Sequence, residues 1–253
     1  MNSYNLSSLT GKLILLATIL ASGMAFLDST VVSIAIPAIQ SNLAADISGI
    51  QWIVNSYTLM LATLILISGS FCDRFGTKRI FLIGMGLFTV SSFLCGLSST
   101  IFQLTFFRAI QGIGAAMMVP GSLSIISTSF DSKEQGKVIG LWSGISGGIA
   151  ALGPLLGGYL VQVFSWSFVF YINIPLGILA LLITWKYVPS TKFHDGHKLD
   201  FVGTILIFFG LLGIAYGLIS GPVWGWSNPL VATSLIVGVV MFCLFIFSSF
   251  KIK

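Results

Sequence analysis

The chain has 253 residues, of which 56% are hydrophobic and 8% are charged, and its mean hydropathy is +1.02. Soluble domains carry about 25% charged residues, so water is not the solvent for most of this surface. The composition excludes a soluble globular protein and predicts a polytopic membrane protein whose first partner is the lipid bilayer.

The net charge of +5 raises the alternative of an acidic partner. The basic residues are scattered between apolar runs and do not form a stripe, so we expect no nucleic-acid partner. Loop lysines and arginines that set the orientation of a membrane protein explain this charge better.

The cysteine and histidine residues do not predict a metal site. Cys72, Cys95 and Cys243 lack metal or redox spacing and are interpreted as small apolar side chains without a disulfide. His194 and His197 fall in a polar stretch, where a solvated loop is the better interpretation than a metal site.

Apolar runs predict eight membrane-spanning helices, because one crossing takes about 20 residues. The first covers residues 13–36 and is interrupted by Asp28. Its apolar run continues past the small residues 21–23, which favours an uncleaved span over a signal peptide. A loop at 37–49 follows, and then spans at 51–71, 80–97 and 101–125, the last of which contains Arg108.

Residues 69–79 are predicted to be a charged loop, bracketed by glycine, between the second and third spans. Residues 131–137 are predicted to be another polar loop. Residues 138–185 and 201–250 carry no charged side chain, and each stretch is long enough for two spans, with turns at 164–167 and 220–229. The longest polar loop is expected at 186–200.

These eight spans place every lysine and arginine except Arg108 on one side of the membrane. Basic residues are enriched in cytoplasmic loops, so both termini are predicted to be cytoplasmic.

Asp28 and Arg108 are the ionisable residues inside the predicted spans. Each costs about 2.5–3.5 kcal/mol at a helix centre, so such residues usually pair and line a functional pathway. Both fall roughly 10–12 Å below the outer ends of their predicted spans, counted at about 1.5 Å per residue. We expect a pair or a shared cavity; the alternative is an ion pair that only fixes helix register.

Two further features of the spans are candidates for function. Gly140, Gly144 and Gly148 share one helix face and are predicted to let another helix approach closely, and Pro154 is predicted to kink the same span. Polar residues in or near spans are candidates for a substrate cavity or, equally, for hydrogen bonds between helices; they include Asn55, Tyr57, Gln103, Gln111, Tyr171 and Asn173.

Several motifs together resemble the major facilitator superfamily, and within it the fourteen-helix drug:proton antiporter branch. The segment 69–79 resembles the loop signature between helices 2 and 3, with Thr77 where a basic residue is usual. Residues 27–37 resemble the first-helix motif, 108–115 the fourth-helix motif, and 165–175 the run into helix 6, with Ser167 where arginine is common. Residues 153–158 resemble the fifth-helix antiporter motif.

The resemblance implies roles for individual residues. Asp28 and Arg108 are expected to handle proton coupling, and Asn55, Tyr57 and Gln111 to line the substrate cavity. The expected antiporter helix contains Gly153, Pro154, Gly157 and Gly158. The expected gating loop is formed by Gly69, Asp73, Arg74, Gly76, Lys78 and Arg79.

The resemblance also implies an architecture. Residues 1–188 would form a six-helix N-terminal bundle, residues 189–200 a cytoplasmic loop, and residues 201–253 two additional helices at about 201–220 and 230–250. A second six-helix bundle is expected in a complete transporter of this family, so this chain is interpreted as an incomplete transporter whose C-terminal half is a possible separate partner.

The resulting expectation is proton-coupled efflux of drugs or other small amphipathic compounds across a bacterial cytoplasmic membrane, driven by the proton gradient and without a cofactor. The alternative is a truncated half that does not transport and acts by association in the membrane. No serine–histidine–aspartate set, carboxylate pair or metal cluster occurs at a common depth, so an enzyme is not expected.

Overall fold

The computed structural model describes residues 4–190 and 201–251, and most of these residues are helical. Within them, eight helical segments are long and apolar enough to cross a membrane. The predicted class, an all-α polytopic membrane protein, is confirmed.

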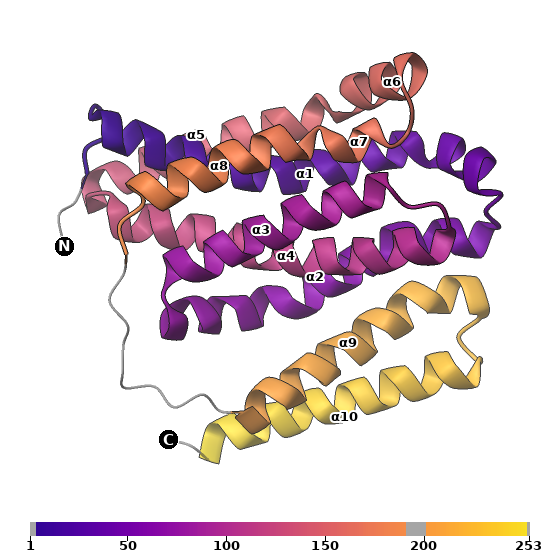
Figure 1. Ribbon diagram of the computed structural model, residues 1–253. Coiled ribbons are helices and arrows are strands. Elements are labelled where there is room, and N and C mark those ends of the chain that lie inside the picture. Colours follow the sequence, from indigo (N-terminus) through magenta and orange to yellow (C-terminus); the bar gives the residue numbers. More distant parts are fainter. Residues whose placement is uncertain (1–3, 191–200, 252–253) are drawn as a thin grey trace.

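The described helices pack side by side along one direction (Figure 1). The bounds of the helices are α1 (Leu9–Leu43), α2 (Ile47–Phe75), α3 (Thr77–Gly96), α4 (Ile101–Ser129), α5 (Ser132–Ala151), α6 (Gly153–Val163), α7 (Phe168–Tyr171), α8 (Asn173–Tyr187), α9 (Phe201–Trp224) and α10 (Pro229–Lys251). Helices α5 and α6 together form one span, as do α7 and α8. Helices α9 and α10 form a hairpin that contacts the rest of the molecule through α2.

The connections between helices are shorter than the sequence predicted. Helix α1 continues through Pro37 to Leu43, α5 already begins at Ser132, and α9 continues through Pro222 to Trp224. The predicted loops at 37–49 and 131–137 and the turn at 220–229 are therefore largely helical. Hydropathy marks the part of a helix at hydrocarbon depth, whereas the ends that project beyond it are polar and remain helical.

The predicted loop at 69–79 is also mostly helix. Asp73 and Arg74 lie in the last turn of α2, and α3 begins at Thr77. The chain turns at Gly76, which has a positive φ of 89° that glycine adopts without strain, and its N–H donates to the Cys72 carbonyl oxygen at 3.1 Å. One glycine thus suffices to reverse the chain. Residues 191–200 of the predicted loop at 186–200, with His194 and His197, lie outside the described residues.

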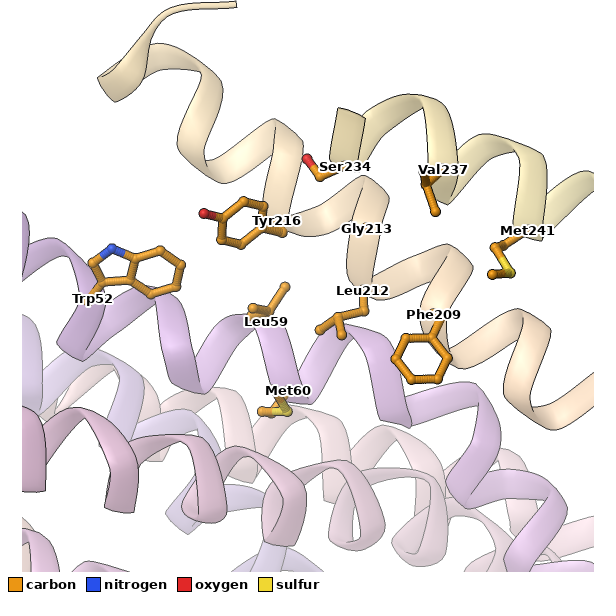
Figure 2. A pocket seen from close by; sticks show the side chains of 10 residues that line it. All are labelled: Trp52, Leu59, Met60, Phe209, Leu212, Gly213, Tyr216, Ser234, Val237 and Met241. Atoms are coloured by element: carbon orange, nitrogen blue, oxygen red, sulfur yellow. The ribbon is translucent and has the colours of Figure 1, made fainter. Parts of the chain in front are cut away.

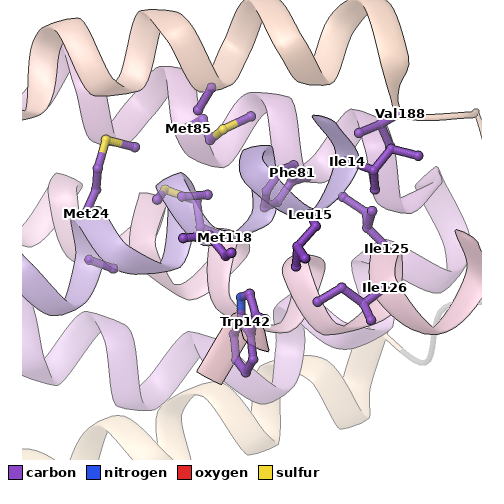
Figure 3. Close-up of a cluster of buried hydrophobic side chains, with 14 of the residues drawn as sticks. Ile14, Leu15, Met24, Phe81, Met85, Met118, Ile125, Ile126, Trp142 and Val188 are labelled. Carbon is purple, nitrogen blue, oxygen red and sulfur yellow. The ribbon is translucent and has the colours of Figure 1, made fainter. Parts of the chain in front are cut away.

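Two apolar cores lie along α1. The first fills the half of the bundle near the start of α1 and includes Ile14, Phe81, Met118 and Trp142 (Figure 3). The second lies nearer the end of α1 and includes Leu27, Val31, Ile53, Leu104 and Phe170. Asp28 of α1 and Arg108 of α4 occur where the side chains of these helices pass from one core to the other.

The orientation of the bundle can be tested with reporters. A reporter that is active only in the cytoplasm should work when it is fused after Val188, and it should be silent after Trp224, because the positive-inside rule places these positions on opposite sides. A periplasm-dependent reporter at the same two positions is the control and should give the opposite pattern. Activity of the cytoplasmic reporter after Trp224 would show that the predicted orientation is wrong.

Candidate functional site

The structure brings Asp28 and Arg108 together in the middle of the bundle. The Arg108 Nη1 donates to Asp28 Oδ2 in an ion pair, and both residues are only 1% exposed. The predicted pairing is confirmed. The pair forms because each charge is costly in an apolar medium and the two neutralise one another.

Three further contacts, from α2 and α4, hold the guanidinium of Arg108 in place. Its Nε donates to the Ile53 carbonyl oxygen of α2 at 3.3 Å, and its Nη1 also donates to Gln111 Oε1 at 2.7 Å. Its carbon Cζ lies 4.2 Å from the centroid of the Tyr57 ring, which is a cation–π distance. The Tyr57 hydroxyl donates to the Ala25 carbonyl oxygen at 3.2 Å, so α2 joins α1 around the pair.

Gln111 links the ion pair to α3. It lies one helical turn after Arg108, and its Nε2 donates to Asp28 Oδ1 at 2.9 Å and to Ser92 Oγ at 2.6 Å. The Cys95 thiol, 3.7 Å from Gln111 Oε1, completes its surroundings. Gln111 is therefore a donor to the carboxylate and an acceptor for the guanidinium at the same time.

Asn173, the first residue of α8, closes the network. Its Nδ2 donates to Ser92 Oγ at 3.1 Å and to Asp28 Oδ1 at 3.3 Å. Its Oδ1 is buried and has no hydrogen-bond partner within residues 4–190 and 201–251. The carboxylate of Asp28 thus accepts hydrogen bonds from three side chains, as an ionised carboxylate does because it has no donor of its own.

Glycines in α4 allow the neighbouring helices to come this close. A Cβ at Gly112 would lie 2.4 Å from the Tyr57 carbonyl oxygen of α2, and a Cβ at Gly114 would lie 2.7 Å from the Gly84 carbonyl oxygen of α3. Both distances are shorter than real side chains allow, so small residues are required here. The approach of α2 and α3 to α4 places Tyr57 and Ser92 around the charges.

The predicted cavity residues have different environments. Tyr57 and Gln111 are buried in the network, with 3% and 0% exposure, so in this conformation they contact Arg108 and do not line an open cavity. Asn55 is half-buried and lies outside the network described above. Sequence reasoning missed Ser92 and interpreted Cys95 as a filler. Their spacing of three residues on α3, one helical turn, was the available signal.

The predicted antiporter helix is built on a close contact with α1. Pro154 has no N–H, so the Ala150 carbonyl oxygen loses its helical partner, and the helix breaks into α5 and α6 at Leu152. The Thr30 hydroxyl of α1 lies 3.0 Å from the Ala150 carbonyl oxygen and 2.9 Å from the carbonyl oxygen of Leu27 in its own helix. It can donate a hydrogen bond to either oxygen. The predicted kink in this span is confirmed as a helix break.

Gly153 and Gly157 face α1, whereas Gly158 does not. A Cβ at Gly153 would lie 1.9 Å from Thr30 Oγ1, and one at Gly157 would lie 3.2 Å from the Val31 carbonyl oxygen. Around Gly158, and equally around Gly140, Gly144 and Gly148, the described residues leave a Cβ free of neighbours within 4 Å. The predicted close approach of a helix to the latter three glycines is therefore wrong for the described part of the chain, because α5 turns its Val138, Trp142 and Ser146 face inward.

The predicted gating segment lies at the α2–α3 junction, at the end of the bundle where α1 begins (Figure 1). The Lys78 ammonium donates to the Trp185 carbonyl oxygen near the end of α8 at 2.8 Å, which ties α3 to α8. The Arg74 guanidinium lies 5.6 Å from the Phe75 ring centroid, and Asp73 precedes it in the last turn of α2. Gly69 lies within α2, and Arg79 in the first turn of α3.

A separate groove of about 500 Å³ lies between α2 and the α9–α10 hairpin (Figure 2). None of its lining residues is charged, and most are apolar. They are Trp52, Leu59, Met60, Phe209, Leu212, Gly213, Tyr216, Ser234, Val237 and Met241. This groove does not include any of the residues around Asp28 and Arg108.

Comparisons with known proteins agree on one family. The model of the Major Facilitator Superfamily matches residues 18–251. The chain is 35% identical to the methylenomycin A resistance protein of Bacillus subtilis, over 98% of this chain and 53% of that protein. It is 37% identical to the tetracenomycin C resistance and export protein of Streptomyces glaucescens, over 90% of this chain and 43% of that protein.

Two further comparisons extend this result. The multidrug resistance protein Stp of Mycobacterium tuberculosis is 37% identical over 94% of this chain and 44% of that protein. The crystal structure of the POT family transporter PepTSo superposes with a TM-score of 0.64 at 16% identity and covers 92% of this chain and 52% of that one, which shows a common fold. The chain thus spans about half the length of the curated relatives that it matches.

Proposed function

Because the chain belongs to the Major Facilitator Superfamily and is similar to its drug-resistance transporters, we propose that it serves proton-coupled efflux of drugs or other small amphipathic compounds. The relatives are bacterial, so the membrane we propose is the bacterial plasma membrane. The proton gradient supplies the energy for this efflux, without a cofactor.

The buried Asp28–Arg108 pair is the observation that supports this function most strongly. An ion pair in the hydrocarbon region costs desolvation energy that a purely structural bundle avoids by using apolar residues. A carboxylate there can take up and release a proton, and protonation removes its attraction to Arg108. Such a change of charge can bias a transporter between its two states, which is the requirement for coupling.

Transport also needs a second bundle. In transporters with this architecture, the substrate lies between two halves that rock against each other, and the described helices supply one half. We propose that a second half, covalent or separate, completes the cavity against α1, α2, α4 and α5. The alternative is a half that does not transport and acts only by association in the membrane.

The transport proposal can be tested in inside-out vesicles with ethidium as the probe compound. The chain alone should give background uptake, whereas the chain fused to the C-terminal half of the B. subtilis methylenomycin A resistance protein should accumulate ethidium when a proton gradient is imposed. An uncoupler should abolish this uptake.

The same vesicles separate the two candidate functions. Uptake by the fused protein that persists without a proton gradient would contradict proton coupling. Absence of uptake from a fused protein that is folded and inserted, measured for several cationic compounds, would favour the association partner over the transporter.

A further inference from the structure

The proton site of Asp28 lacks one component in the state that the structure shows. Among the described residues, every polar side chain that is hydrogen-bonded to the carboxylate donates to it: Arg108, Gln111 and Asn173. When Asp28 takes up a proton, its O–H becomes a donor and needs an acceptor, since a buried donor without an acceptor is destabilising. A neighbouring oxygen atom must therefore accept a hydrogen bond from this O–H.

Most of the nearby oxygen atoms are already occupied. Gln111 Oε1 accepts from Arg108 at 2.7 Å and lies 3.7 Å from the Cys95 thiol. Ser92 Oγ accepts from both Gln111 and Asn173. Within the described residues, Asn173 Oδ1 is the buried oxygen of this network that lacks a partner, although its own amide nitrogen already reaches Asp28.

We propose that Asn173 is a positioning residue for the proton on Asp28, and that its side-chain amide rotates by half a turn when Asp28 is protonated. The rotation exchanges Nδ2 and Oδ1, which have nearly the same size and shape. Oδ1 then faces Asp28 and accepts from its O–H, and Ser92 Oγ changes from acceptor to donor toward the same oxygen. This inference rests on the proposed proton-coupled function and deepens it.

The rotation changes which amide atom of Asn173 occupies the unpartnered position. In the ionised state Oδ1 occupies it, and in the protonated state Nδ2 would occupy it, so one amide atom lacks a partner in both states. The 3.3 Å contact from Nδ2 to Asp28 is at the long end for an N–H···O bond, so little is lost when it breaks. The amide can therefore satisfy either form of the carboxyl group, which a fixed donor cannot.

The proton balance is simple. A hydronium ion of the aqueous phase gives its proton to Asp28 and leaves water, while Asn173 neither gains nor loses a proton. In the part of the chain that the structure describes, the titratable groups that face Asp28 are Arg108 of α4, Tyr57 of α2 and Cys95 of α3. The ionisable side chains of α5 lie in its first two turns, where Glu134 accepts from the Leu6 N–H, and α8 presents the uncharged Asn173 to Asp28.

Infrared difference spectroscopy of the whole chain in lipid tests this inference. The protein is labelled with asparagine that carries carbon-13 in its side-chain amide, and spectra are compared across roughly pH 4–9. A carboxylic-acid band that is absent from Asp28→Asn should appear as the pH falls, together with a loss and a gain in the labelled amide region. The amide pair should disappear in Asn173→Leu while the acid band remains.

Asn228→Ser is the matched control, because it removes a labelled amide from the turn between α9 and α10 and should leave the pair unchanged. An acid band from Asp28 without any labelled amide change in the wild-type chain would overturn the inference and leave the proposed coupling intact; this result does not depend on the folding of a variant. Absence of the acid band would overturn the role of Asp28 in coupling and this inference with it.

Discussion

Replacing Arg108 with leucine is expected to lower the stability of the bundle by about 3–5 kcal/mol, because Asp28 then remains as a buried charge without its counter-ion. The double variant Asp28→Leu/Arg108→Leu should recover most of that loss, since apolar residues of similar volume often replace a buried ion pair at little cost. Thermal unfolding of the purified chain in detergent measures both effects. Lys133→Ala, on the exposed first turn of α5, is the control.

The double variant also separates a coupling role from a purely structural one. In the fused protein described above, it should be folded yet unable to accumulate ethidium against the proton gradient. Accumulation at the wild-type rate would mean that the pair only fixes the packing of α1 against α4. A double variant less stable than Arg108→Leu would contradict the electrostatic reason given for the loss.

Much of the fold was predictable because the membrane restricts the choices. A segment in hydrocarbon must satisfy its own backbone, so long apolar runs become helices, and two charges inside such runs must find a partner. These arguments predicted eight spans and the contact between Asp28 and Arg108, and both are confirmed. The same arguments do not locate helix ends, because polar residues such as Asp73 and Ser132 continue a helix beyond the hydrocarbon.

The surroundings of the pair were harder to predict. Ser92 and Cys95 are ordinary small residues of a span, and they become part of the site because Gly114 lets α3 approach α4. Asn173 joins them because the sixth span breaks between α7 and α8 and points this side chain at Asp28. Such contacts depend on the positions and angles at which helices pack against one another. Local patterns in a single sequence do not predict this packing.

The glycines of the fifth span illustrate the same limit. Four-residue spacing at Gly140, Gly144 and Gly148 predicted a packed face, yet their surroundings are open in the described residues. Gly153, which follows the helix break, is in tight contact with Thr30. Spacing identifies which residues share a face; the neighbouring helix decides whether that face is buried.

Replacing Gly153 with alanine is therefore expected to destabilise the bundle by about 1–3 kcal/mol, the usual cost of overpacking. The added Cβ would lie 1.9 Å from Thr30 Oγ1 and 2.6 Å from Thr30 Cβ, so α6 would have to move away from α1. That movement would also separate the Thr30 hydroxyl from the Ala150 carbonyl oxygen. This oxygen has no helical donor, because residue 154 is a proline without an N–H. Thermal unfolding of the purified chain measures the loss.

Gly158→Ala is the matched control, five residues further along the same helix. The described residues leave room for its Cβ, and alanine is the better helix former, so the variant should be as stable as the wild-type chain or more stable by about 0.5–1 kcal/mol. Thr30→Gly introduced into Gly153→Ala removes the two Thr30 side-chain atoms nearest to the new methyl group and should restore part of the loss. Equal stability of Gly153→Ala and Gly158→Ala would show that α1 and α6 do not require this close contact.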